Sequence, residues 1–161
     1  SDHFKITQGT IWDGKYLYDL YKEAFTPWDW HEELFRICAD EGLEVFSSPF
    51  DKTAVDFLES LNVPAYKIAS FEITDIPLIE YVASKMKPII ISTGIANIED
   101  IKLALEACKK LGNNDVAFLK CTSSYPAPLD QANLLMIKDL SHKFDVISGN
   151  IQFYDDEYGG L

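Results

Sequence analysis

The fold is decided by residues 65–94, "AYKIASFEITDIPLIEYVASKMKPIIISTG". This stretch begins and ends with short runs rich in β-branched residues, at 65–70 and 87–94, which are typical of buried strands. Between the two runs, apolar residues from Ile76 to Val82 recur at helical spacing. A strand, a helix and a second strand in succession form a β–α–β unit, so the sequence predicts that the two strands are parallel.

The same pattern extends along the chain in both directions. Further strand-like runs occur at 43–50, 115–122 and 145–149. Helical patterns lie between the runs, at 51–62, 75–86, 97–112 and 133–144. The serines that end the first three runs, Ser48, Ser70 and Ser92, are spaced at equal intervals of 22 residues. This regular spacing predicts about five consecutive βα units with parallel strands.

Two α/β architectures are built from such units. The length of 161 residues favours an open, flavodoxin-like parallel sheet, because a closed (β/α)8 barrel usually needs more than about 200 residues. The polar residues that follow the successive strands favour a barrel, which collects functional groups from consecutive strands around a ring. We therefore predict an incomplete (β/α)8 barrel of the TIM type with sequential strand order, and keep the flavodoxin-like open sheet as the alternative.

The predicted barrel accounts for residues 43–149 only. Residues 1–42 contain no strand pattern, and we expect them to form a helical entry segment and loop of the barrel. Residues 150–161, "NIQFYDDEYGGL", follow the last predicted strand as a separate tail.

Composition excludes several classes of function. The formal net charge of −12 disfavours nucleic acid and anionic membranes as partners, because both require a basic face. No apolar run is long enough to span a membrane, and no leader-like segment is recognised at the start. The three cysteines, Cys38, Cys108 and Cys121, show neither disulfide nor zinc-site spacing. We expect reduced cysteines in a cytoplasmic protein.

Lys67 is the residue that most clearly suggests a binding site. It lies within a run predicted to be a buried strand, and a lysine is rarely buried without a partner. Two structural explanations remain open beside a functional one. Lys67 could form a salt bridge with Glu72, and the serines at the strand ends could cap the helices that follow.

Four motifs, in this order and spacing, carry a resemblance to a known family. They are "SSPFD" (47–51), "YKIASFEITDIPLI" (66–79), "KPIIISTGIANIEDI" (87–101) and "KCTSSYPAPLDQANL" (120–134). The chain closely resembles the phosphoenolpyruvate-dependent sialic acid (nonulosonic acid) synthases, which have a (β/α)8 barrel. The segment 9–31, "GTIWDGKYLYDLYKEAFTPWDWH", is most similar to the pseudaminic acid synthase branch. The N-acetylneuraminate and legionaminate branches share the barrel motifs and remain alternatives.

The resemblance implies an activity for the parent enzyme. It would condense phosphoenolpyruvate with an open-chain N-acetylated amino sugar, 2,4-diacetamido-2,4,6-trideoxy-altrose, to give pseudaminic acid and phosphate. A divalent metal, manganese or magnesium, would polarise the sugar aldehyde, and the complete enzyme would be a homodimer. An alternative from another class is an inactive remnant that acts as an anion-binding or assembly module.

The resemblance also assigns roles to individual residues. Lys67 and Glu72 would be catalytic, with Lys67 on phosphoenolpyruvate and Glu72 on the sugar. Substrate-binding roles fall on Ser48, Ser70, Ser92, Ser123 and Tyr125. Ser123 departs from many family members, which have asparagine at this position.

The tail departs from the family pattern. After the run at 145–149 the family continues with a segment whose histidine binds the metal, whereas this chain continues with residues 150–161. The metal ligands of the family are therefore absent from this chain, so we predict no metal site in it and no synthesis by this chain alone.

Overall fold

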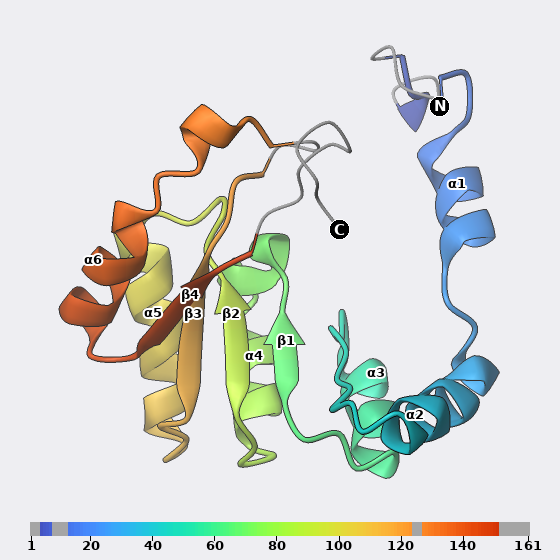
Figure 1. Ribbon diagram of the computed structural model, residues 1–161, viewed down its shortest axis with the longest axis horizontal. Helices are drawn as coiled ribbons and strands as arrows, with labels where there is room; N and C mark the ends of the chain where they lie inside the picture. The colour runs from blue at the N-terminus through green and yellow to red at the C-terminus, as the bar shows by residue number, and fades with distance from the viewer. Residues whose placement is uncertain (1–3, 8–12, 124–126, 152–161) are drawn as a thin grey trace. The chain divides into compact units, whose positions relative to one another are not determined.

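The computed structural model describes residues 4–7, 13–123 and 127–151 (Figure 1). The chain divides into two compact units, Ser1–Leu43 and Glu44–Leu161. The helices of the first unit are α1 (Leu17–Ala24), η2 (Trp28–Trp30) and α2 (His31–Asp40). No helix in the described ranges combines the length and the apolar character needed to cross a bilayer.

The second unit contains a four-stranded parallel sheet in the order β1-β2-β3-β4. Its strands are β1 (Tyr66–Ile68), β2 (Ile89–Ser92), β3 (Val116–Lys120) and β4 (Ile147–Asn150). The sequential order confirms the order predicted for a barrel wall. It contradicts the flavodoxin-like alternative, in which the chain reverses direction across the sheet.

Helices follow the strands as predicted. They are α3 (Lys52–Ser60), η3 (Ser70–Thr74), α4 (Ile76–Ala83), α5 (Ile98–Lys110), η4 (Leu129–Gln131) and α6 (Leu135–Phe144). The side chains of Asp51, Asp75 and Asn97 accept hydrogen bonds from backbone N–H groups at the starts of α3, α4 and α5. These residues cap the helices, so the hypothesis that the strand-end serines are the caps is wrong.

The two faces of the sheet differ in character. Along β3, Val116 and Phe118 are buried on one face, and the ring of Phe118 packs edge-on against Phe144 of α6. Figure 1 shows α4 and α5 behind the sheet on one side. The opposite face carries Ala117 and Leu119, which line a hollow. Helices on a single face are typical of a barrel wall, whereas an open doubly wound sheet has helices on both faces.

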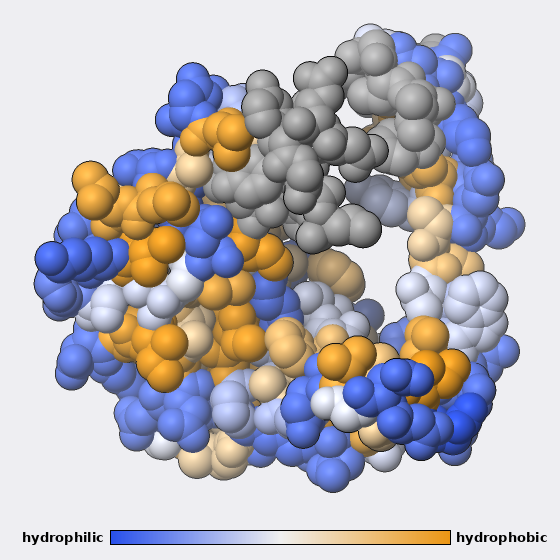
Figure 2. All heavy atoms as spheres, viewed as in Figure 1, coloured by the Kyte–Doolittle hydropathy of each residue, from blue (hydrophilic) through white to orange (hydrophobic). Residues whose placement is uncertain are grey.

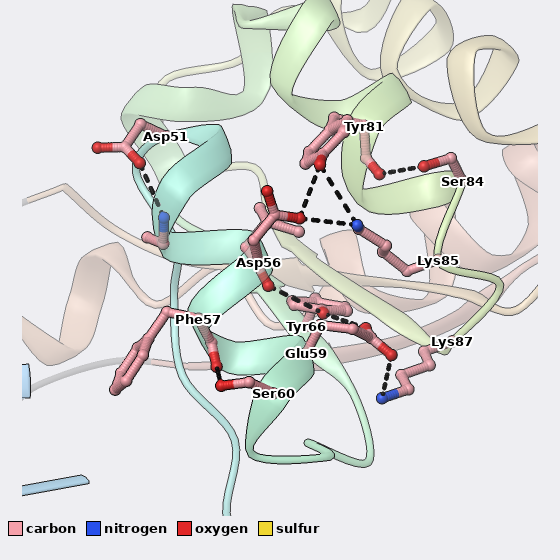
Figure 3. A network of polar contacts seen from close by, with 12 residues as sticks. Asp51, Asp56, Phe57, Glu59, Ser60, Tyr66, Tyr81, Ser84, Lys85 and Lys87 are labelled. Atoms are coloured by element: carbon pink, nitrogen blue, oxygen red, sulfur yellow. Dashed lines mark hydrogen bonds and ion pairs between the residues drawn. The ribbon is translucent and has the colours of Figure 1, made fainter.

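A polar network on the helix side joins α3 to β1 and α4 (Figure 3). The Tyr66 hydroxyl donates to Glu59 at 2.6 Å, and Lys87 forms an ion pair with the same carboxylate at 3.0 Å. The Tyr81 hydroxyl donates to Asp56 at 2.7 Å. The hydrogen bond from Tyr66 lowers the pKa of Glu59. Tyr66 and Lys87 thus have structural partners, unlike Lys67, which points to the opposite face.

The strand predicted within 43–50 is reduced to a single bridge. Ser47 pairs in parallel with Tyr66, and the Lys67 N–H donates to the Ser47 carbonyl oxygen at 3.3 Å. Pro49, two residues further on, has no N–H with which to extend the ladder. The prediction of a fifth strand is therefore wrong for this segment, although its backbone lies beside β1 where that strand was expected.

The far edge of the sheet is exposed. Within the described residues, β4 pairs with β3 alone, and Ile147 on this strand is 78% exposed. Figure 2 shows apolar side chains gathered over the part of the unit that carries α6. Exposed apolar residues here include Leu134, Leu135 and Met136. An edge strand with exposed N–H and C=O groups is able to pair with a further strand.

Candidate functional site

The inner face of the sheet and the loops after its strands form a hollow of about 680 Å³. Its polar lining includes five of the residues predicted from the sequence, namely Ser48, Lys67, Ser70, Ser92 and Ser123. Its apolar walls come from Phe46, Phe50, Phe71, Ile90, Ala117 and Leu119. Residues that are far apart in the sequence thus share one concave surface.

The parallel sheet explains why these side chains meet. Lys67 lies at the centre of β1, opposite Ile90 of β2, and its neighbours on the strand are buried on the helix side. Ser92 is the last residue of β2, and Ser70 begins η3 directly after β1. Ser123 follows β3. Because parallel strands all end at the same edge of the sheet, the serines gather at one mouth.

Lys67 is half-buried and weakly paired. Among the residues that the structure describes, its ammonium meets the Ile68 carbonyl oxygen at 3.4 Å and forms no salt bridge with Glu72. Burial lowers the pKa of Lys67, and the electrostatic influence of Cys121 and Glu72 partly opposes this shift. An ammonium has three N–H donors, so Lys67 has donors to spare for an anion in the hollow.

Glu72 does not line the hollow, in contrast to the five residues above. It belongs to η3, and its Oε2 atom is buried without a hydrogen-bond partner among the described residues. A buried carboxylate oxygen without a partner is costly, so this atom has unused capacity for a ligand. Tyr125, the remaining predicted site residue, lies outside the described residues.

A comparison with protein-family models identifies the family of this chain. The model of the NeuB family matches residues 1–152. The chain belongs to the NeuB family. The match includes the four motifs and both units described above, so the family assignment rests on nearly the whole sequence.

Individual relatives within the NeuB family agree with this result. The chain is 49% identical over 144 residues to the pseudaminic acid synthase of Helicobacter pylori and 44% identical over 144 residues to that of Campylobacter jejuni. Each alignment covers 89% of this chain and 42% of the relative. The chain thus spans less than half the length of these curated relatives.

A solved structure supports the fold. The spore coat polysaccharide biosynthesis protein E from Chromobacterium violaceum superimposes with a TM-score of 0.80 at 29% sequence identity. The superposition covers 96% of this chain and 45% of that protein. The fold of the second unit is accordingly a segment of the (β/α)8 barrel found in NeuB-family structures.

Three residues in or beside the hollow were not predicted from the sequence. Cys121 and Thr122 line the hollow, and Gly94 adjoins it through its contact with Ser70, which Cys121 also contacts. Cys121 could have been found from the strand alternation, because Ala117, Leu119 and Cys121 follow one another at every second position. Gly94 gave no such signal, since its contacts come from distant strands.

Lys120, the last residue of β3, contacts residues on both sides of the segment that follows the strand. It is 5% exposed, on the helix side of the sheet. Its ammonium donates to Thr122 Oγ1 at 2.7 Å and to the Gln131 carbonyl oxygen at 3.2 Å. Thr122 lies shortly after β3, and Gln131 ends η4. Lys120 therefore joins these two segments from the helix side of the sheet, which the sequence pattern did not reveal.

We expect Lys120→Met to reduce the free energy of unfolding by about 1–3 kcal/mol, because Thr122 and Gln131 lose the charged donor that the buried Lys120 supplies to both. Urea denaturation measures the loss, and hydrogen exchange at 127–132 should become faster. Lys138→Met, which removes an exposed lysine of α6, is the matched control. Equal stability of the two variants would contradict this role.

Within residues 4–7, 13–123 and 127–151, no three His, Cys, Asp or Glu side chains lie close enough together to hold a metal ion. The described side chains therefore do not fit the divalent metal that the resemblance implies. No step of the reaction is therefore assigned to a metal.

Proposed function

We propose that this chain carries the phosphoenolpyruvate end of the active site of a nonulosonic acid synthase. The complete protein would condense phosphoenolpyruvate with an open-chain N-acetylated amino sugar, giving pseudaminic acid and phosphate. The observation that supports this best is the weakly paired ammonium of Lys67 in a hollow lined by five serines. Membership of the NeuB family and the identity to two pseudaminic acid synthases support it independently.

The hollow suits a small, highly charged anion. The ammonium of Lys67 and the hydroxyls of Ser48, Ser70 and Ser92 are hydrogen-bond donors that can replace the water around a phosphate or carboxylate group. The apolar walls reduce the number of water molecules that can surround these donors, which strengthens the interactions. No carboxylate residue is among the residues that line the hollow within the described part of the chain.

The reaction proceeds by formation of a carbon–carbon bond. The enol carbon of phosphoenolpyruvate attacks the aldehyde carbon of the sugar, and the aldehyde oxygen takes up a proton. Water adds to the resulting cationic carbon and releases a proton, and phosphate leaves by cleavage of its carbon–oxygen bond. Lys67 and the serines would hold phosphoenolpyruvate. Glu72, whose buried oxygen is unpartnered among the described residues, would hold or protonate the sugar oxygen.

The family resemblance implies the altrose-derived sugar, the homodimer and the role of Tyr125. The division into an entry segment at 1–42, a partial barrel at 43–149 and a tail at 150–161 also stays a prediction. The N-acetylneuraminate and legionaminate activities remain alternatives, because the residues of the hollow would contact phosphoenolpyruvate, which all three reactions share.

A titration of the chain with phosphoenolpyruvate tests the proposal. We expect saturable binding with a Kd on the order of 1 mM, since only part of the site is present. In an amide NMR titration, the shifts should be largest at Lys67, Ser70, Ser92 and Gly94. Pyruvate, which lacks the phosphate group, should bind much more weakly at the same ionic strength.

The pattern of shifts decides the outcome. Shifts spread over exposed lysines, without saturation, would show nonspecific attraction of an anion and would overturn the proposal. Equal binding of phosphoenolpyruvate and chloride at matched ionic strength would do the same.

A further inference from the structure

Three groups from three consecutive strand ends meet around Gly94. The Gly94 N–H donates to Ser70 Oγ at 3.1 Å, and Ser70 Oγ lies 3.0 Å from Cys121 Sγ. A Cβ atom added at Gly94 would lie 2.6 Å from Ser123 Oγ and 2.8 Å from both Cys121 Sγ and Ser70 Oγ. The absent side chain of Gly94 therefore leaves the space in which these contacts form.

The Ser70 hydroxyl has a limited hydrogen-bonding capacity. It has one O–H donor and two lone pairs, and the Gly94 N–H occupies one lone pair. The contact with Cys121 allows two directions. If Ser70 donates to the sulfur, it has no proton left for an anion. If the Cys121 S–H donates to Ser70, both lone pairs are filled and the Ser70 proton is free to point to a ligand.

We infer that Cys121 is a positioning residue, whose S–H donates to Ser70 Oγ and so directs the Ser70 proton to a bound anion. This inference rests on the proposed function and adds a residue to it. An anion accepts hydrogen bonds only, so it selects the direction in which Ser70 donates to it. A hydrogen bond from a hydroxyl to a charged oxygen is also stronger than one to a sulfur, which is a weak acceptor.

Two substitutions separate this role from simple packing. We expect Cys121→Ala to weaken phosphoenolpyruvate binding by about 3- to 10-fold, the range for one neutral hydrogen bond. Cys121→Ser keeps a donor on the same side chain and should bind within about twofold of the wild type. Cys38→Ala, in the other unit, is the control and should bind as the wild type does. Equal weakening in both Cys121 variants, or none in either, would overturn the inference.

A second measurement works without a ligand. In a Cys38→Ala/Cys108→Ala background, the infrared S–H stretch reports Cys121 alone. Its frequency should shift when Ser70→Ala is added, because the hydrogen-bond partner is removed, and it should also shift when phosphoenolpyruvate binds. An S–H band that does not respond to Ser70→Ala would overturn the inference.

The two measurements distinguish two failures. If the wild type does not bind phosphoenolpyruvate, the proposed function fails, and with it the direction of the Ser70 proton toward an anion. The response of the S–H band to Ser70→Ala would then still show whether Cys121 is bonded to Ser70. If the wild type binds but neither Cys121 variant differs from it, the function holds and the role of Cys121 is overturned.

Discussion

Replacing Lys67 with Met should weaken phosphoenolpyruvate binding by about 10- to 100-fold, which corresponds to the loss of a charged hydrogen-bond donor. Methionine keeps an unbranched side chain of similar length, so the apolar part of Lys67 is retained. The other donors of the hollow, Ser48, Ser70 and Ser92, remain in place. The loss therefore reports the ammonium itself, and isothermal titration of both proteins measures it.

The same substitution should leave the protein at least as stable as the wild type. Burial lowers the pKa of Lys67, so folding disfavours its charged form. A lysine whose pKa is depressed by folding destabilises the fold wherever it is charged in the unfolded chain, which is below a pH of about 10.4. Lys67→Met removes this cost at neutral pH. The thermal midpoint should therefore stay constant or rise.

Lys102→Met is the matched control, because it removes one positive charge from an exposed position on α5. Its binding should equal that of the wild type. A lower thermal midpoint for Lys67→Met with unchanged binding would show that Lys67 is structural, and the site proposed around it would be wrong.

Gly94→Ala should abolish measurable binding of phosphoenolpyruvate and destabilise the fold by about 1–3 kcal/mol, the usual range for overpacking. The new Cβ would lie within 3 Å of three side-chain atoms, those of Ser70, Cys121 and Ser123. These short side chains would have to rotate away, which breaks the contacts that orient the Ser70 hydroxyl. Urea denaturation and the amide NMR titration measure the two effects separately.

Gly112→Ala is a control that strains the backbone without touching the hollow. Gly112 has a φ of +82° after α5, and a Cβ there would meet no atom within 4 Å. We expect it to lower stability by about 1 kcal/mol and to leave binding unchanged. If Gly94→Ala binds phosphoenolpyruvate as Gly112→Ala does, the space around Gly94 is not part of the site.

The helices could be predicted from the sequence because their signals are local. Asp51, Asp75 and Asn97 cap helices within a few residues of themselves, and Gly112 follows α5 with the positive φ expected after a helix. The strand order followed from the regular alternation of strands and helices. The segment 43–50 was predicted as a strand from its apolar residues, but a strand also needs neighbours along its length, and this segment forms a single bridge to β1.

The candidate site was predicted only in part. The family resemblance pointed to Lys67 and four serines, and the structure places them around one hollow. Glu72 belonged to the same prediction but does not line that hollow. Glu72 lies two residues after Ser70 in the sequence, and the turn of η3 separates their side chains in space.

The sequence by itself determined the succession of strands and helices and the residues at the strand ends, because these depend on interactions between near neighbours in the chain. Only the tertiary structure decided which of those residues meet. The contact of Ser70 with Cys121 joins residues 51 positions apart, and its contact with Gly94 joins residues 24 positions apart. Such contacts exist because hydrogen bonds between parallel strands set the relative heights of the strand ends, a property of the assembled sheet and not of any one segment.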